Sequence, residues 1–290
     1  MLKNFLDISE LKAPELLSIV KYRTNKSLLL GKNIGLLFEK YSTRTRLSFH
    51  TAISQLGGNA IDIRLDELNI SRDESFKDTF KAMNCYLDGL VYRTNNHQKL
   101  INASNYFKKP IINALSDKSH PCQTISDLFT LYEKFSSLDL NILWIGDCNN
   151  VLYSLIEAVN LITEINLIIC TPTAIASNIN IKLKENIKVI NDISKESLDD
   201  IHCVMTDVFI SMNEDDSQNK VNLLKSYTVN AEIMQRTSDK SVFMHCLPAK
   251  VGLEVSEEVF EGKKSIVWKQ AYNRLIAQKN LFNHLYSTDS

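Results

Sequence analysis

Hydroxyl and guanidinium side chains cluster in the segment Ser-Thr-Arg-Thr-Arg at residues 42–46. An apolar run typical of a buried strand precedes this segment, and a stretch with helical periodicity follows it. A strand that turns into a helix at such a point offers free backbone N–H groups, hydroxyl groups and a positive charge to one anion. Ser42 suits the position before a helix, and Arg44 or Arg46 can bind two oxygens in one plane. The segment therefore predicts a phosphate site, although a solvated basic turn would have the same composition.

Five further groups of polar residues follow predicted strands. They are Arg93, His120–Gln123, Gly146–Asn150, Asp207–Met212 and His245–Pro248. In open α/β sheets, ligands bind outside the carboxyl ends of the strands. These groups are therefore candidates for a small-molecule site.

Each group also has a structural explanation when it is taken alone. Arg93 would usually be a surface charge, His120–Gln123 a capping segment, and Asn150 the cap of the next helix. Gly146–Asn150 lacks the glycine pattern of dinucleotide loops. The histidines and cysteines lack zinc-site spacing, so no metal is predicted. Cys246 with a distant histidine leaves a covalent thiol mechanism open.

Short apolar runs alternate with helical patterns along the chain, which predicts an α/β fold with parallel sheets. The predicted strands are 34–38, 60–63, 89–92, 110–113, 141–145, 167–170, 187–190, 201–206 and 242–245. The predicted helices are 43–56, 75–87, 98–103, 123–135, 151–162 and 270–286, with an amphipathic helix in residues 1–20. The pattern restarts after Ser136-Ser137, so we expect two domains, with the ligand site in a cleft between them.

The overall composition excludes several classes of function. The 290 residues have a formal net charge of −1, which argues against bulk binding of nucleic acid or an acidic membrane. Charged residues interrupt positions 1–20, so this segment reads as neither a signal peptide nor a membrane span. Six scattered cysteines without a C-x-x-C pair favour a reducing, cytoplasmic setting.

Taken in order, these motifs resemble those of the carbamoyltransferases, and within them the ornithine branch. The matching segments are Phe38–Phe49, Asp73–Ser75 with Asp78-Thr79, Arg93-Thr94, Asn113–Asp117, His120–Gln123, Gly146–Val151, Asp207–Met212, His245–Pro248 and Ala271–Arg274. Ser211-Met212 after Asp207, and Cys246 after His245, resemble the ornithine pattern more than the aspartate pattern.

The resemblance implies a role for each matching residue. Carbamoyl phosphate would be bound by Ser42, Thr43, Arg44, Thr45, Arg93, His120, Gln123, Cys246, Leu247 and Arg274. Ornithine would be bound by Asn150, Asp207, Ser211 and Met212. The catalytic set would be Arg44, Arg93 and His120, which stabilise developing charge, with Asp207 and Cys246, which orient the substrate amines.

The resemblance also implies a reaction and an assembly. The carbamoyl group would pass from carbamoyl phosphate to the δ-amine of L-ornithine, giving citrulline and phosphate in arginine metabolism, without a metal or cofactor. A carbamoyl-phosphate-binding domain (1–135) would be rejoined by residues 274–290, an ornithine-binding domain would span 136–273, and the protein would form homotrimers or multiples of trimers. Another amine substrate, such as N-acetylornithine or putrescine, or a non-catalytic metabolite-binding paralogue, stays open. Asn213 and Lys250-Val251 depart from the family pattern and support the non-catalytic paralogue.

Overall fold

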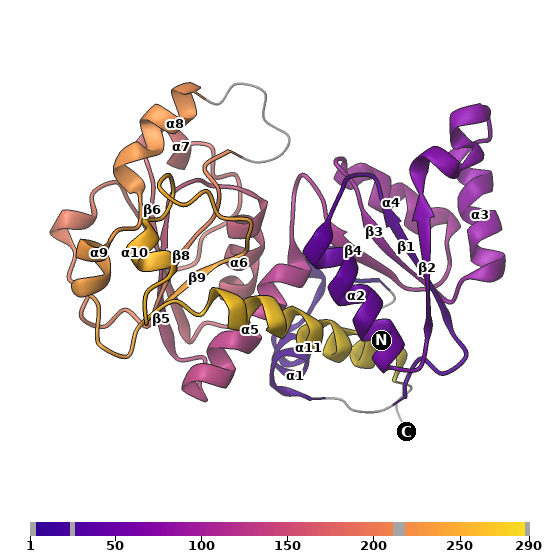
Figure 1. The fold of residues 1–290 in the computed structure, drawn as a ribbon, viewed down its shortest axis with the longest axis horizontal. Helices are drawn as coiled ribbons and strands as arrows, with labels where there is room; N and C mark the ends of the chain where they lie inside the picture. The colour runs from indigo at the N-terminus through magenta and orange to yellow at the C-terminus, as the bar shows by residue number, and fades with distance from the viewer. Residues whose placement is uncertain (1–3, 24–26, 211–217, 288–290) are drawn as a thin grey trace. The chain divides into compact units, whose positions relative to one another are not determined.

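The computed structural model describes residues 4–23, 27–210 and 218–287. The strands are β1 (Asn33–Phe38), β2 (Asn59–Arg64), β3 (Gly89–Arg93), β4 (Ile111–Leu115), β5 (Leu140–Ile145), β6 (Ile165–Cys170), β7 (Ile187–Ile190), β8 (Cys203–Thr206) and β9 (Val242–His245). The α-helices are α1 (Ala13–Lys21), α2 (Thr43–Gln55), α3 (Phe76–Tyr86), α4 (His97–Tyr106), α5 (Pro121–Phe135), α6 (Asn150–Leu161), α7 (Thr173–Ala176), α8 (Gln218–Leu224), α9 (Ala231–Gln235), α10 (Glu257–Phe260) and α11 (Val267–Tyr286) (Figure 1). None of the helices in the described ranges combines the length and the apolar character that crossing a bilayer requires.

The chain divides into two compact units. Unit 1 comprises Met1–Phe129 and Asn273–Ser290, and unit 2 comprises Thr130–Tyr272. Each unit contains one sheet in which all strand pairings are parallel. The predicted α/β fold with two parallel sheets is therefore confirmed. The divisions fall within α5 and α11, whereas the predicted domain boundaries follow residues 135 and 273.

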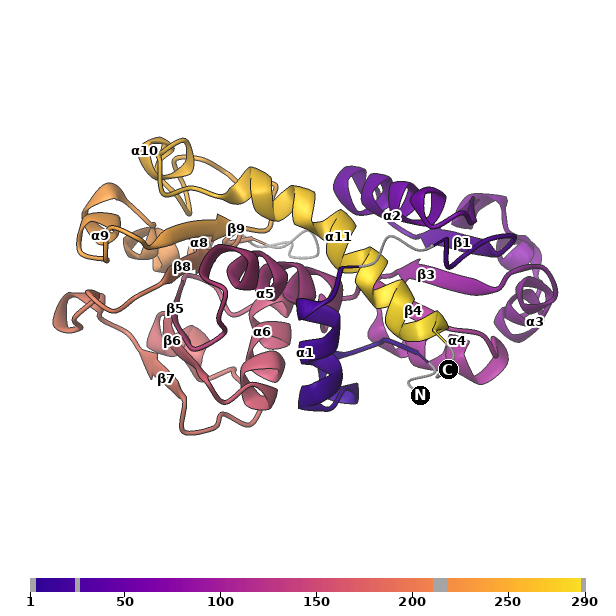
Figure 2. The ribbon, with the colours of Figure 1, turned by 90° about the horizontal axis from the view of Figure 1, so that it is seen from below.

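The sheet of unit 1 has the strand order β2-β1-β3-β4. The chain moves from β1 to β2 in one direction across the sheet, and from β2 to β3 and β4 in the opposite direction. Because parallel crossovers are right-handed, α2 lies on one face of the sheet and α3 and α4 lie on the other (Figure 2). Phe80 of α3 and Phe107 lie in the core on the second face. On the first face, Phe49 of α2 meets Phe282 of α11 edge to face, with ring centroids 6.1 Å apart. Burial of these rings fixes both layers to the sheet.

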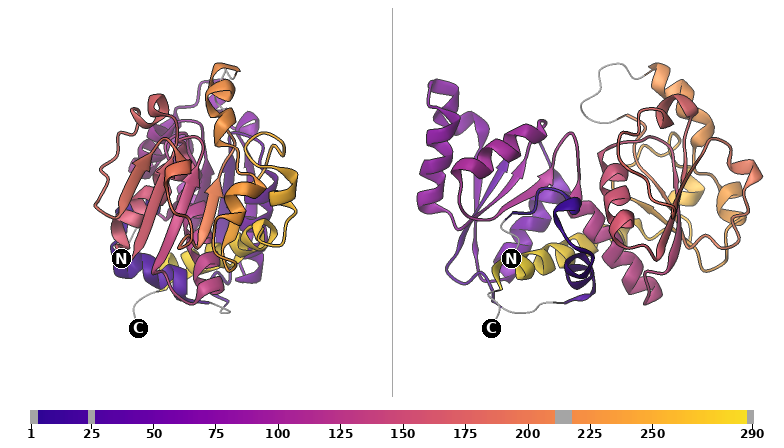
Figure 3. Two further views of the ribbon diagram at one scale, coloured as in Figure 1. Left: turned by 90° about the vertical axis from the view of Figure 1, so that its left-hand side faces the viewer. Right: turned by 180° about the vertical axis from the view of Figure 1, so that it is seen from behind.

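The sheet of unit 2 has the order β7-β6-β5-β8-β9, and its strands run side by side in the left view of Figure 3. The β5 strand lies at the centre and is fully covered, since Ile142, Leu143 and Trp144 are all 0% exposed. Central strands of parallel sheets read as continuous apolar runs for this reason. The apolar segment at 141–145 was therefore a reliable predictor of a strand.

The amino-terminal prediction was wrong in part. Residues 1–20 were expected to form one amphipathic helix, but α1 begins only at Ala13, with Pro14 in its first turn. Before it, Phe5 pairs with Ile112 of β4 in a parallel bridge. The amide of Phe5 donates to Ile111 at 2.8 Å, and that of Asn113 donates to Phe5 at 2.8 Å. This segment extends the sheet because the edge strand β4 otherwise leaves its backbone groups unpaired.

Candidate functional site

The first turn of α2 presents the predicted phosphate-binding residues in unit 1. Ser42 occupies the position before the helix, with extended backbone angles, and its side chain makes no capping hydrogen bond. The first amides of this 13-residue helix carry the positive end of its dipole. Arg46 is held by Asp62 of β2 at 2.8 Å. Of the two arginines considered for the phosphate, Arg44 is therefore the better candidate.

Arg274 of α11 binds two residues that are far away in the sequence. Its guanidinium group donates to the hydroxyl of Thr45 at 2.7 Å and to the side-chain oxygen of Gln123 at 2.5 Å. The amide of Gln123 donates in turn to Asp127 at 2.8 Å. All four side chains are buried. The structure thus brings together three of the predicted ligands of carbamoyl phosphate.

Arg93 ends β3 and is only 5% exposed, so its interpretation as a surface charge was wrong. Burial, together with the positive charges of Arg274 and Arg44, lowers the pKa of Arg93 to about 10. A buried guanidinium group that two other guanidinium groups repel favours a ligand with more than one negative charge. This electrostatic arrangement is the strongest sign of an anion site in unit 1.

His120 immediately precedes α5, and its carbonyl accepts hydrogen bonds from Gln123 and Thr124. Pro121 occupies the first helical position, where its lack of an N–H group costs nothing. The His120 side chain is 4% exposed. Burial lowers its pKa well below the usual value, and the charges of Arg274 and Arg93 act in the same direction. The imidazole is therefore neutral at pH 7, where it can donate one hydrogen bond and accept another.

We expect the stability of the free protein to fall as the pH drops from 7 to 5.5. The unfolded chain takes up a proton on this histidine near pH 6.5, whereas the folded chain does not until a lower pH. The free energy of unfolding should therefore decrease by up to about 1.4 kcal/mol per pH unit in this window. Urea denaturation of a His120→Gln variant should show a shallower pH dependence, while His50→Gln, on the exposed side of α2, should follow the wild type. Equal slopes in all three proteins would contradict the assignment.

Asp207 is the centre of the polar group in unit 2. It follows β8 and is 6% exposed. One carboxylate oxygen accepts from the side-chain amide of Asn149 at 2.7 Å, and the other accepts from the thiol of Cys246 at 2.9 Å. Asn149 also caps α6, because its side-chain oxygen accepts from the amides of Val151 and Leu152. The loops after β5, β8 and β9 are thus joined at one carboxylate.

The segment after β9 is fixed by fully buried groups. His245 and Glu254 are 1% and 0% exposed, and the imidazole Nε2 lies 3.2 Å from the Glu254 carboxylate. The imidazole Nδ1 accepts from the backbone amide of Leu247 at 2.9 Å, so the proton must lie on Nε2. Leu247 has a positive φ of 60°, an uncommon angle for a non-glycine residue that needs such support. The pair therefore sets the backbone course at Cys246 and Leu247.

Comparison with known proteins gives a single answer for both units. Residues 3–133 match the family domain described as aspartate/ornithine carbamoyltransferase, carbamoyl-P binding domain, and residues 138–285 match the Asp/Orn binding domain of the same family. An ornithine carbamoyltransferase of Haloquadratum walsbyi is 36% identical over 296 residues, which cover 98% of each chain. This chain belongs to the ornithine carbamoyltransferase family. The predicted class, a carbamoyl-group transferase, is thereby confirmed.

Solved structures of ornithine carbamoyltransferases agree. The anabolic enzyme of Campylobacter jejuni is 32% identical, with a TM-score of 0.88 over 98% of this chain and 99% of that chain. The enzyme of Pyrococcus furiosus is 29% identical, with a TM-score of 0.88 over 99% and 98%. The similarity therefore covers both units of this carbamoyltransferase.

Two alternatives for Cys246 in this carbamoyltransferase can now be judged by geometry. Ligand atoms of Asp207, His245 and Cys246 lie within 4.8 Å of one another, as in a metal site. Both nitrogens of His245 are engaged, however, with Leu247 and Glu254, so the imidazole cannot turn a lone pair to a metal without losing one of these contacts. For the same reason His245 is poorly placed to take a proton from the thiol. The thiol donates to the Asp207 carboxylate instead.

Replacement of Cys246 by serine should therefore weaken the carbamoyltransferase reaction without abolishing it. A hydroxyl group can donate the same hydrogen bond, and a typical change in one hydrogen bond is worth about 1 kcal/mol, or roughly a fivefold effect. The steady-state rate with both substrates is the measurement. Complete loss of turnover with intact ornithine binding would instead support a covalent thiol mechanism.

Some residues of the two polar groups were predicted from the sequence, and others were not. Asn150, the predicted ornithine ligand, is the first residue of α6. It is not the cap of this helix, because Asn149 occupies that position. Ser211, Met212 and Asn213 lie outside the described residues. Asn149, Glu254 and Asp127 were missed, because each acts through a contact that is distant in sequence or hidden within a helix. The doubled asparagine at 149–150 was the only local signal among them.

Proposed function

We propose that this chain catalyses transfer of the carbamoyl group from carbamoyl phosphate to the δ-amine of L-ornithine, which yields citrulline and phosphate. Membership of the ornithine carbamoyltransferase family supports this reaction. The observation that carries the proposal is the buried guanidinium group of Arg93 together with the guanidinium groups of Arg274 and Arg44, whose charges repel it. Such a group is unfavourable in the free protein and favours a ligand with several negative oxygens.

Unit 1 would hold carbamoyl phosphate. Its phosphate would lie at the first turn of α2, against Ser42, Thr43, Arg44 and Thr45, where backbone amides and the helix dipole favour an anion. Its carbamoyl end would lie against Arg93, His120, Gln123 and Arg274. The Thr45 hydroxyl already accepts from Arg274, which leaves its own proton available to a phosphate oxygen.

Unit 2 would hold ornithine through its amino groups. The Asp207 carboxylate is the buried negative charge that a substrate ammonium group requires, and Asn149 and Cys246 orient it. Asn150 would contribute a neutral amide, and Ser211 and Met212 complete the predicted set. The δ-amine must be neutral to attack, and its deprotonation near pH 7.5 costs about 4 kcal/mol from the lysine reference value.

The chemistry then needs stabilisation of charge more than proton transfer by the protein. The amine nitrogen forms a bond to the carbonyl carbon, and negative charge develops on the carbonyl oxygen. The bond from carbon to the phosphate oxygen then breaks, and the departing phosphate takes up the proton that the nitrogen must lose. Arg44 and Arg93 would stabilise the developing charge on both oxygens. Neutral His120 would donate a hydrogen bond to the carbonyl oxygen, a role that does not require a charged imidazole.

The remaining expectations are part of the same proposal. The reaction needs no metal or organic cofactor, because phosphate is already a good leaving group. A homotrimer, or a multiple of trimers, and a role in arginine metabolism are proposed from the family. A reducing, cytoplasmic setting is proposed from the scattered cysteines, which include no C-x-x-C pair.

Citrulline formation from carbamoyl phosphate and L-ornithine tests the proposal. N-acetylornithine, putrescine and aspartate should be offered in parallel under the same conditions. We expect turnover with ornithine alone. Turnover with a different amine only would refute the assignment of unit 2 and leave that of unit 1. Tight binding of carbamoyl phosphate without any turnover would show a non-catalytic paralogue.

A further inference from the structure

A short loop joins the end of β4 to His120. Its ends are closed by two contacts between the same pair of residues, since the amide of Ser116 donates to the carbonyl of Ser119 at 2.9 Å and the amide of Ser119 donates to the hydroxyl of Ser116 at 3.2 Å. Both serines are buried, at 0% and 2% exposure. Because His120 is the next residue, the course of this loop decides where the imidazole lies.

Asp7 anchors this loop from the amino-terminal segment. The bridge between Phe5 and β4 delivers Asp7 to the loop, where its carboxylate is 7% exposed. One oxygen accepts from the hydroxyl of Ser119 at 2.5 Å, and the other accepts from the ammonium group of Lys118 at 3.0 Å. Burial by itself would raise the pKa of Asp7, but the contacts with His97, Ser119 and Lys118 outweigh it and lower the pKa. The carboxylate is therefore ionised at neutral pH.

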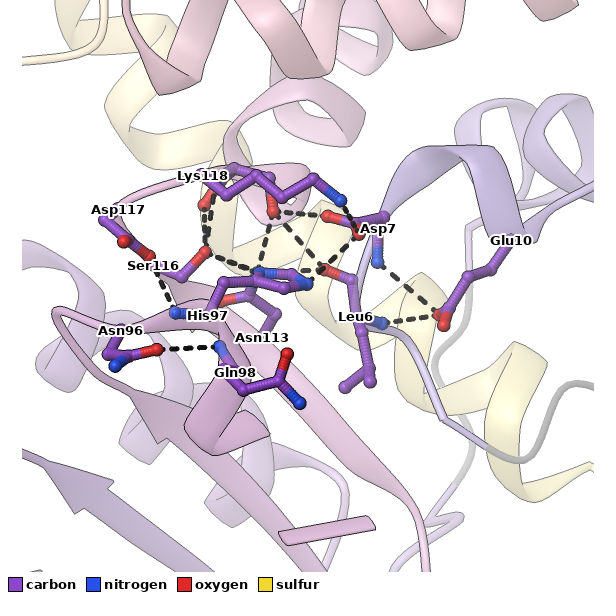
Figure 4. A network of polar contacts seen from close by, with 11 residues as sticks. Leu6, Asp7, Glu10, Asn96, His97, Gln98, Asn113, Ser116, Asp117 and Lys118 are labelled. Atoms are coloured by element: carbon purple, nitrogen blue, oxygen red, sulfur yellow. Dashed lines mark hydrogen bonds and ion pairs between the residues drawn. The ribbon is translucent and has the colours of Figure 1, made fainter. Parts of the chain in front are cut away.

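His97 connects Asp7 with a second loop. It is the first residue of α4, four residues after Arg93 at the end of β3, and it is 7% exposed. Its Nε2 lies 3.2 Å from the Asp7 carboxylate, and its Nδ1 lies 2.9 Å from the Ser116 hydroxyl. Its backbone amide donates to Asp117 at 2.7 Å. Figure 4 shows the imidazole between Asp7 and Ser116, with Lys118 above.

The order of these groups resembles a nucleophilic triad, but the serine cannot serve as a nucleophile. Ser116 is 0% exposed, so no substrate can reach it. Its hydroxyl oxygen also receives hydrogen bonds from the Ser119 amide at 3.2 Å and from the Asn113 side chain at 3.4 Å. The chain of contacts is therefore mechanical: it ties the loop before His120 to the start of α4, just after Arg93 ends β3.

We propose that Asp7 and His97 are positioning residues for the carbamoyl phosphate site, which they serve by holding His120 and Arg93 at a fixed separation. This inference rests on the proposed function of unit 1. Neither residue touches the substrate. Their effect arises because a displacement of about 1 Å in a catalytic group can cost about a hundredfold in rate.

Binding of carbamoyl phosphate to His97→Ala and Asp7→Ala, measured by titration calorimetry, tests the proposal. We expect each variant to raise the Kd by about tenfold or more, with the KM for ornithine unchanged. The double variant should have about the same Kd as the single variant that binds less tightly, because both residues act through one chain of contacts. Ser116→Ala removes the hydroxyl that contacts His97, together with its contacts to Ser119 and Asn113. It should raise the Kd in the same direction, and because the substitution is small it guards against a variant that fails to fold.

Asp88→Ala is the matched control. Asp88 precedes β3 at the opposite end of the strands, where its carboxylate accepts from the amide of Asn33 at 2.9 Å. This variant should lose stability but keep the wild-type Kd. An unchanged Kd in folded His97→Ala, equal weakening in the control, or additive effects in the double variant would each overturn the inference. A wild-type protein that binds no carbamoyl phosphate would refute the proposed function itself, and the inference with it.

Discussion

An Arg93→Met variant should lose at least about thirtyfold in affinity for carbamoyl phosphate. Arg93 is buried, and removal of one partner of a buried charge pair costs about 2–5 kcal/mol, which corresponds to roughly 30-fold to several thousandfold. Calorimetric titration with carbamoyl phosphate measures the loss directly. Arg64→Met is the matched control, because Arg64 ends β2 as Arg93 ends β3, but pairs with the exposed Asp66. An Arg93→Met variant that binds as tightly as the control would refute the anion site.

The same substitution should leave the ligand-free protein as stable as the wild type, or more stable. The depressed pKa of Arg93 corresponds to a cost on the order of 3 kcal/mol for holding its charge in the free protein, and methionine has a similar volume without charge. A gain in melting temperature that accompanies loss of binding would show that the cost of burying this charge beside Arg274 and Arg44 is maintained for the ligand. A large loss of stability would show instead that Arg93 serves the fold.

Asp207→Asn should raise the KM for ornithine by about a hundredfold. The substitution removes the negative charge that would face the substrate ammonium group, at a typical cost of about 2–5 kcal/mol. The carboxylate accepts hydrogen bonds from Asn149 and Cys246. In the variant, the new amide NH2 group would face one of these two donors, so that one hydrogen bond is lost. Initial rates at varied ornithine give the change, while the Kd for carbamoyl phosphate should stay the same, because its main contacts lie in unit 1.

Asp147→Asn separates this effect from a general loss of stability. Asp147 lies in the same unit, is equally buried and accepts from the ammonium group of Lys220 at 2.8 Å. We expect its stability to fall by a similar amount and its KM for ornithine to change by no more than a few fold. An equal rise in KM for both variants would contradict the role of Asp207.

Much of the fold could be predicted because apolar runs in parallel sheets are long and well separated. The strand at Ile187–Ile190 was predicted to the residue, and Thr43 was placed correctly as the start of α2. The strand predicted at 110–113 ended too early, because the polar Asn113 was taken as its end. In fact Asn113 is fully buried, and its side chain donates to the carbonyl of Leu6 at 2.9 Å. A partner more than a hundred residues away leaves no local signal.

The site was predictable where chemistry is local and unpredictable where it depends on packing. The Ser-Thr-Arg-Thr-Arg segment indicated an anion site by itself, but the choice of Arg44 over Arg46 required the contact of Arg46 with Asp62. Glu254 gave no sequence signal, since a glutamate in a charged segment is usually exposed. Its 0% exposure and its contact with His245 appear only in the folded chain.

The contact of Arg274 with Thr45 has a consequence for synthesis of the chain on the ribosome. The two residues are 229 positions apart, and Arg274 is translated only after the whole of unit 2. The nascent unit 1 must therefore wait for α11 before Phe282 covers Phe49 and Arg274 reaches Gln123. Until then, Phe49 lacks the ring that covers it, and the anion site lacks the guanidinium group of Arg274. The order of translation thus delays the completion of unit 1 until unit 2 has been synthesised.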